Sequence, residues 1–172
     1  MSTLRVDTIA NTAGVTTNRV LQVVSTTKTD TFSSGSTTFV DVTGMSLNIT
    51  PSSTSNKILV SYNLNVSNTA VGYSSSWKLV RNSTDIGVGD ASGVIKRVTN
   101  QVFSDTYGFV LYHPSMTFLD SPSSTSQLTY KIQAMTNYGA SFPFYLNRGQ
   151  AEGNSAHYGR TISTITAMEI AG

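Results

Sequence analysis

Apolar and polar residues alternate along several short stretches of the chain, most regularly over residues 56–67. There the apolar side chains occupy every second position, and they are Ile58, Val60, Tyr62, Leu64 and Val66. A β-strand points successive side chains to opposite faces, so the pattern predicts a strand with one dry and one wet face. Such a strand cannot bury its own dry face, and the rest of the chain must supply an opposing sheet.

Similar apolar stretches recur about every 8–12 residues and are separated by loops rich in Gly, Pro, Asn and Ser. Besides residues 56–67, strands are expected at residues 20–25, 29–33, 37–42, 45–50, 73–81, 94–98, 102–112, 116–119, 127–135 and 160–170. The stretch 20–25 is apolar enough to be a buried strand, whereas 137–159 reads as a long irregular loop. This spacing is typical of a sandwich, jelly roll or barrel.

Composition supports an all-β protein. Charged residues make up 12% of the chain, and 50 of its 172 residues are Ser or Thr. Because these hydroxyl residues interleave with Val, Ile, Tyr and Phe, they suit the wet faces of strands better than a disordered chain. Cysteine is absent, which excludes disulfides and thiolate metal sites. A small all-β domain without such links commonly depends on oligomerisation.

Charge and hydropathy argue against two classes of partner. The net charge is +2 and no basic stripe gathers Lys and Arg, so nucleic-acid binding is not expected. Residues 1–10 lack a hydrophobic core of signal-peptide length, and no apolar run is long enough to span a bilayer. We therefore expect synthesis in a cytoplasm without export by a signal sequence, and no membrane insertion.

The first 19 residues differ from the rest in carrying few large apolar side chains. Two interpretations remain open, a frayed terminus and an arm that docks on a partner through Leu4, Val6 and Ile9. The expected organisation is an N-terminal docking arm at residues 1–19 and a β domain at residues 20–172.

Residues that carry chemistry are scattered. The two histidines, His113 and His157, have no cysteine nearby, and no Gly-x-Ser-x-Gly elbow occurs. Carboxylates for glycoside cleavage would have to come from turn residues, namely Asp85, Asp90, Asp105 and Asp120. Asp in such turns commonly bonds its own backbone. The sequence predicts no catalytic residues, no metal site and no cofactor.

The loop over residues 137–159 combines aromatic rings with amides and a guanidinium, the groups that contact sugars. The candidate glycan-contact residues are Tyr138, Asn147, Arg148, Asn154, His157 and Tyr158. The alternative is that Phe142, Phe144 and Tyr145 are core or subunit-contact residues and that the glycines merely turn the chain.

Several runs resemble small structural proteins and fibre heads of tailed bacteriophages. The runs are FVDVTGMSLNITPSSTSNKILVSYNLNVS, WKLVRNSTDIGVGD, LDSPSSTSQLTYKIQAM and ISTITAMEIAG, and the opening STLRVDTIANTAG is similar to N-terminal attachment segments of phage fibres. The resemblance implies a homotrimeric antiparallel jelly-roll sandwich akin to the tumour necrosis factor and complement globular-head superfamily. It also implies that the C-terminal strand lies near the threefold axis, with subunit contacts at Ile162, Ile165, Met168 and Ile170.

Together these observations favour a non-enzymatic virion structural protein of a bacteriophage. The homotrimer would be held to other virion proteins by its arm and displayed on the virion surface as a short fibre or host-binding head, where a host surface glycan is the ligand to consider. One alternative is a capsid decoration (cement) protein. Another is a polysaccharide-binding or polysaccharide-degrading module.

Overall fold

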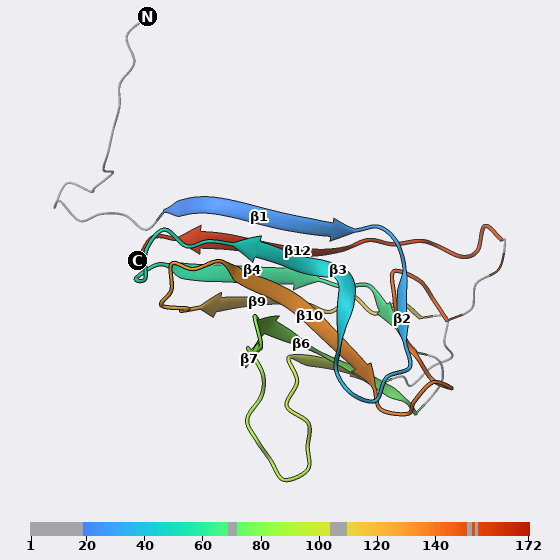
Figure 1. Cartoon of the computed structure of the whole chain (residues 1–172). Coiled ribbons are helices and arrows are strands. Elements are labelled where there is room, and N and C mark those ends of the chain that lie inside the picture. The colour runs from blue at the N-terminus through green and yellow to red at the C-terminus, as the bar shows by residue number, and fades with distance from the viewer. Residues whose placement is uncertain (1–18, 69–71, 104–109, 151–152, 154) are drawn as a thin grey trace, which may run out of the picture.

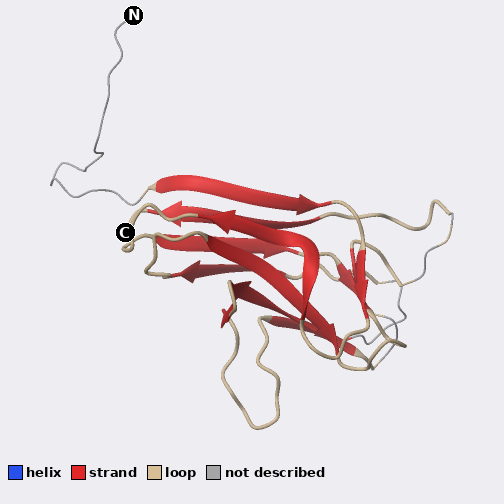
Figure 2. Cartoon of the chain, in the orientation of Figure 1, coloured by secondary structure: helices blue, strands red, loops and turns tan. Residues whose placement is uncertain are grey.

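The structure is a computed structural model that describes residues 19–68, 72–103, 110–150, 153 and 155–172. The described residues form strands and loops without a helix, as Figure 2 shows. The strands are β1 (Val20–Lys28), β2 (Phe32–Ser34), β3 (Val40–Ile49), β4 (Lys57–Asn63), β5 (Val66–Ser67), β6 (Ser74–Arg81), β7 (Thr84–Ile86), β8 (Asn100–Phe103), β9 (Ser115–Asp120), β10 (Leu128–Thr136), β11 (Phe144–Leu146) and β12 (Ser163–Ile170).

Two main sheets face each other in an antiparallel sandwich (Figure 1). The four-stranded sheet has the order β1-β12-β4-β9. The five-stranded sheet has the order β3-β10-β6-β7, with β8 also paired to β6. A small third sheet, β2-β11-β5, joins three short strands. The prediction of an all-β antiparallel jelly-roll sandwich is confirmed.

The alternation over residues 56–67 is confirmed by burial. All five of its apolar residues on the predicted dry face are at most 3% exposed and belong to the core. β4 itself ends at Asn63, and the chain then passes to β5 in the small sheet. The core opposite β4 includes Trp77, whose indole Nε1 donates a hydrogen bond to the Tyr62 hydroxyl (3.2 Å).

A polar cluster links the two main sheets. Arg81 on β6 donates to both carboxylate oxygens of Asp120 on β9 at 2.7 Å, and the Tyr130 hydroxyl on β10 donates to the same carboxylate at 2.6 Å. Burial and this hydrogen bond to Asp120 raise the pKa of Tyr130, so it stays neutral. A buried charge is tolerated when it is paired and hydrogen-bonded, which is the case here.

Several predicted strand boundaries are wrong. Residues 37–42 and 45–50 form one strand, β3, that continues through Gly44 (φ 82°) with a register shift against β10. Between Asp41 and Ser46, β3 has three more residues than the facing stretch of β10 between Lys131 and Gln133, and this irregularity bends the strand at the glycine without ending it. The stretch predicted as an irregular loop contains a short strand, β11, that was not predicted. Phe144 in β11 is fully buried, which confirms the alternative interpretation that it belongs to the core.

The segment between β7 and β8 also differs from the prediction. Residues 94–98 form no strand but belong to a loop that projects from the sandwich (Figure 1), and Val94 in this loop is fully exposed. Of the strand predicted at 102–112, only the part up to Phe103 lies in β8, and residues 104–109 lie outside the described residues.

β1 is the edge strand of its sheet and not the buried strand that its apolar residues predicted. It pairs with β12 on one side only, and Val20, Leu21 and Val23 are exposed. Exposed apolar residues on a sheet edge and face call for a cover, which the described part of the chain does not provide.

A buried glutamate fixes the end of the sandwich at which β1 begins and β12 ends, which we call the termini end. The Glu169 carboxylate, 1% exposed, accepts hydrogen bonds from the Gln22 side chain, the Ser52 backbone and hydroxyl, and the Asn56 side chain. Burial raises the pKa of Glu169, but these hydrogen bonds outweigh burial and lower it to about 2. At the same end, the Ala171 backbone N–H donates to the Arg19 carbonyl (2.9 Å).

Candidate functional site

The predicted glycan-contact residues do not form one site. Asn147 is fully buried and structural: its Nδ2 donates to the carbonyls of Lys28 and Asp30 at 2.9 Å, and its Oδ1 accepts from Ser163 at 2.7 Å. The Arg148 guanidinium lies over the Tyr145 ring, 4.6 Å from its centroid. Asn147 is therefore not available to a sugar, whereas Arg148 is half-buried and its guanidinium also bonds the carbonyls of Gly149 and Gln150.

The other members of that set are exposed or undescribed. Tyr138 is exposed, and its ring meets Tyr73 edge to face with centroids 4.5 Å apart. His157 and Tyr158 are exposed in the loop before β12, and Asn154 lies outside the described residues. The structure therefore places Tyr138, His157 and Tyr158 on the surface, leaves Arg148 half-buried, and removes the amide of Asn147 from the set.

The outer face of the four-stranded sheet carries a continuous row of apolar side chains. Backbone pairing places Val23 opposite Met168, Met168 opposite Leu59, and Leu59 opposite Leu119. Directly paired residues lie on the same face, so these four side chains, which we call the apolar row, cross the whole sheet from β1 to β9. Val23 is 56% exposed and Leu119 is 47% exposed.

The next two rows on this face are polar throughout. Their members are Ser25, Thr166, Ser61 and Thr117 in the first row, and Thr27, Thr164, Asn63 and Ser115 in the second. Each row takes one residue from each strand, in the order β1, β12, β4 and β9. The outer face therefore has an apolar half toward the termini end and a hydroxyl-rich half toward the opposite end, which we call the loop end.

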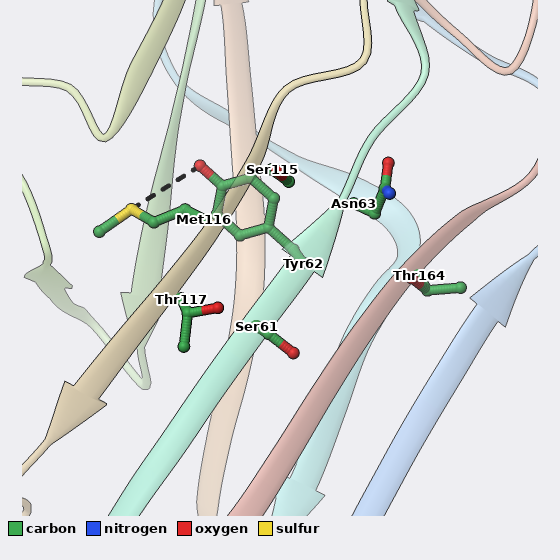
Figure 3. A pocket seen from close by; sticks show the side chains of 7 residues that line it. All are labelled: Ser61, Tyr62, Asn63, Ser115, Met116, Thr117 and Thr164. Carbon is green, nitrogen blue, oxygen red and sulfur yellow. Dashed lines mark hydrogen bonds between the residues drawn. The ribbon is translucent and has the colours of Figure 1, made fainter.

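A shallow hollow of about 430 Å³ opens on the hydroxyl-rich half (Figure 3). Its lining residues come from three adjacent strands and are Ser61, Tyr62, Asn63, Ser115, Met116, Thr117 and Thr164. None of these side chains is charged at neutral pH. Tyr62 and Met116 are joined by a hydrogen bond from the phenol to the thioether sulfur, drawn as the dashed line in Figure 3.

A second hollow of about 290 Å³ adjoins the first and shares Asn63 and Thr164 with it. Its remaining lining residues are Asn65, His113 and Ile162. Asn65 is fixed between the other two, because its Oδ1 bonds His113 Nδ1 and its Nδ2 donates to the Ile162 carbonyl. The two hollows together, which we call the loop-end hollow, form a trough lined mostly by polar residues, with Met116 and Ile162 as its aliphatic members.

The four residues expected at a subunit contact are separated by the fold. Ile165 points to the inner face and is fully buried in the core, so it has no surface to offer a neighbour. Met168 and Ile170 lie on the outer face near the termini end, whereas Ile162 borders the loop-end hollow. An extended strand rises about 3.3 Å per residue, which puts Ile162 and Ile170 roughly 26 Å apart along the chain.

The carboxylates and histidines of the described chain do not cluster. Within that part of the chain, no group of three or more His, Cys, Asp or Glu side chains is placed to hold a metal ion. Asp85 pairs with Lys78 at 2.7 Å, and Asp120 is engaged in the cluster with Arg81. Asp105 and the arm residues Leu4, Val6 and Ile9 lie outside the described residues. No described helix is long and apolar enough to cross a membrane.

Comparison with known proteins reveals similarity at the level of the fold. No protein-family model and no curated protein matches the chain. A solved structure of infectious bursal disease virus, Gt strain, has a TM-score of 0.50 at 15% identity over 97% of this chain and 44% of that one. A VP2 subviral particle of the same virus has a TM-score of 0.42 at 13% identity over 97% of this chain and 43% of the other.

The chain spans less than half the length of these viral proteins. The first similarity agrees with the jelly-roll-type sandwich described above.

The sequence analysis missed the loop-end hollow. The signal was present in each strand separately, because Ser61 and Asn63, Ser115 and Thr117, and Thr164 all occupy alternate outward positions. What the sequence lacked was the register that sets these positions side by side.

Proposed function

We propose that this chain is a non-enzymatic structural protein of a bacteriophage virion. It forms a homotrimer, is anchored to other virion proteins through residues 1–19, and is displayed on the particle surface as a short fibre or host-binding head. The similarity of the fold to a viral capsid protein supports the viral part of this proposal.

The observation that carries the proposal is the apolar row. It crosses all four strands of one sheet, and its members are flanked on the same outer face by Ile170 of β12. Soluble monomers rarely expose a continuous apolar surface, and the cores of subunit interfaces are depleted of charge. On the outer face of β4, β9 and β12 the only charged side chain is Lys57. A second subunit that covers this half of the face would remove the row from water.

The arrangement of the ends fits attachment at one end and display at the other. β1 begins at the termini end, so residues 1–19 are joined to the domain at the end that carries the apolar half. The described part of the loop between β11 and β12 lies at the opposite end (Figure 1). The loop-end hollow is at that end too, because it is lined by Asn63 at the end of β4 and Ile162 just before β12. An arm bound to the particle therefore leaves the loop end directed outward.

Two measurements test the proposal. Sedimentation of the full chain at micromolar concentration should give a trimer, and a monomer would refute it. Removal of residues 1–19 should leave a folded trimer that no longer joins the particle, and retained incorporation would refute the docking arm.

Imaging of the assembled particle separates fibre from decoration. We expect the chain on a tail or vertex with its loop end outward. A regular array that bridges capsid subunits would instead identify a capsid decoration (cement) protein. Release of reducing ends from a host polysaccharide would contradict the non-enzymatic assignment.

A further inference from the structure

We propose that the loop-end hollow is a binding site for a neutral oligosaccharide. The inference rests on the host-binding role proposed above and names its ligand class and residues. It differs from the site expected in the loop over residues 137–159, because it lies on the sheet and uses side chains of β4, β9 and β12.

The chemistry of the lining selects for hydroxyl groups. Ser61, Thr117 and Thr164 each present a hydroxyl that both donates and accepts, and Asn63 adds an amide with both functions. A sugar hydroxyl has the same dual character, so it can bond such side chains in several orientations. In Figure 3 these side chains come from three neighbouring strands around one hollow.

The spacing of the lining suits an extended ligand. Neighbouring strands lie about 4.8 Å apart, and alternate residues of one strand lie roughly 6.7 Å apart. The register sets Thr164, Asn63 and Ser115 in one row, and Ser61 and Thr117 in the next. One sugar unit can therefore reach two strands at once, and a following unit can reach the adjoining hollow.

The second hollow supplies the apolar contact that polar rows lack. Ile162 is 53% exposed there, beside the ring of His113. The C–H face of a pyranose packs against apolar surface while its hydroxyls bond the polar groups. In ligand sites generally, apolar side chains bury the ligand and polar groups fix its orientation. The His113 ring is oriented for this contact by its hydrogen bond to Asn65.

The lack of charge indicates a neutral ligand. Acidic sugars are commonly recognised by Arg or Lys, whose charge assists the hydrogen bonds to a carboxylate. The lining residues of the two hollows include neither Arg nor Lys. A neutral chain is therefore the expected ligand, and sialylated or uronic-acid chains are not.

The site stays accessible in the proposed trimer. Along β12, Met168 of the apolar row and Thr164 of the hollow are four residues apart, about 13 Å in an extended strand. A subunit seated on the apolar half can cover that half and leave the hollow open at the loop end.

The test uses the full-length chain and two matched double variants. In Ser61→Ala/Thr117→Val the hollow loses two hydroxyls, and in Ser25→Ala/Thr27→Val the same two residue types are changed on β1, outside the hollow. Both pairs lie on the outer face of the same sheet, and Thr→Val preserves shape and strand propensity. Titration calorimetry would use neutral hexasaccharides of glucose, mannose and galactose, with hexauronates as acidic probes.

The unchanged chain should bind at least one neutral hexasaccharide and none of the hexauronates. Loss of two neutral hydrogen bonds should weaken binding by about tenfold in the hollow variant, with no change in the β1 variant. The inference is overturned if no neutral probe binds at millimolar concentration, if hexauronates bind more tightly, or if the two variants behave alike.

Sedimentation of the same samples separates this inference from the proposed function. A trimer that binds no sugar refutes the site and leaves the assembly role intact. A monomer that binds neutral sugar refutes the trimer and leaves the site intact.

Discussion

The two halves of the outer face share the same four strands and differ only in their side chains. In the apolar half, Val23, Met168, Leu59 and Leu119 form one row. Two residues along each strand, at the next outward position, every side chain is Ser or Thr, as in Ser61 and Thr117. Because the backbone pairing is continuous between the halves, the difference in surface chemistry comes from the side chains and not from a change in fold.

Under the two proposals above, one sheet carries two interaction surfaces without a loop. The apolar half gains stability by exclusion of water, which suits permanent contact between subunits. The hydroxyl-rich half remains well solvated until a ligand replaces its water, which suits reversible contact. The predictions below separate the inner face from the outer face and then one half from the other.

The largest expected effect belongs to the inner face. Ile165→Asp places a carboxylate in the core, where Ile165 is fully buried between the sheets. Burial of an unpaired charge should cost about 4 kcal/mol or more and unfold the subunit itself. Loss of the folded far-ultraviolet circular dichroism spectrum at 25 °C, together with a shift of the chemical denaturation midpoint, would confirm it. A folded monomer would show that Ile165 belongs to a subunit contact after all.

A charge in the apolar row should separate subunits that remain folded. Met168→Asp places a carboxylate between Val23 and Leu59 at the proposed interface. The protein concentration at which half of the trimer has dissociated should therefore rise at least about 30-fold. Thr166→Asp is the matched control, because it lies on the same strand and face in the neighbouring polar row. Analytical ultracentrifugation should find only the first variant dissociated, and equal dissociation of both would remove the distinction between the halves.

The Glu169 cluster should make the termini end sensitive to acid. Because its pKa is lowered from 4.5 to about 2 in the folded protein, Glu169 contributes stability that is fully present above pH 4.5 and lost as the pH falls toward 2. Glu169→Gln should remove this part of the pH dependence. It should also cost about 1–3 kcal/mol at pH 7, since an amide N–H would face the donors of Gln22 and Asn56. Denaturation curves from pH 2 to 7 would measure both, and an unchanged pH profile would contradict the assignment.

The smallest effect is expected in the hydroxyl-rich half. Thr164→Val replaces an outward hydroxyl by a methyl group on β12, where the side chain borders the hollow. Its unfolding free energy should stay within about 0.5 kcal/mol of the unchanged chain, and the trimer should persist. A decrease of many degrees in the melting temperature would show instead that the Thr164 hydroxyl stabilises the fold.

Local patterns predicted the sandwich well because burial of one strand face needs only alternation. Ile58, Val60 and Tyr62 could be assigned to the core from spacing alone, and the structure buries all three. Gly44 misled the prediction, since a glycine that ends one strand and a glycine that forms a bulge within it have the same sequence signature.

The surface was harder to predict because it depends on partners distant in sequence. Val20, Leu21 and Val23 were expected to be buried, and only the position of β1 at the sheet edge exposes them. Asn147 resembled a ligand-binding amide but satisfies the carbonyls of Lys28 and Asp30, which lie more than a hundred positions earlier in the chain. The trimer, the arm and the glycan site remain predictions that the experiments above can decide.

The central place of β12 affects how the protein is made. β12 separates β1 from β4 in the four-stranded sheet, yet it is the last of these strands to leave the ribosome. Until then the nascent chain has β1 without its partner and β4 paired on one side only, so two strand edges are open to other chains. A polypeptide released early, before Ser163, would keep both edges and aggregate. Synthesis of β12 is therefore the step that closes the sheet and creates the continuous outer face.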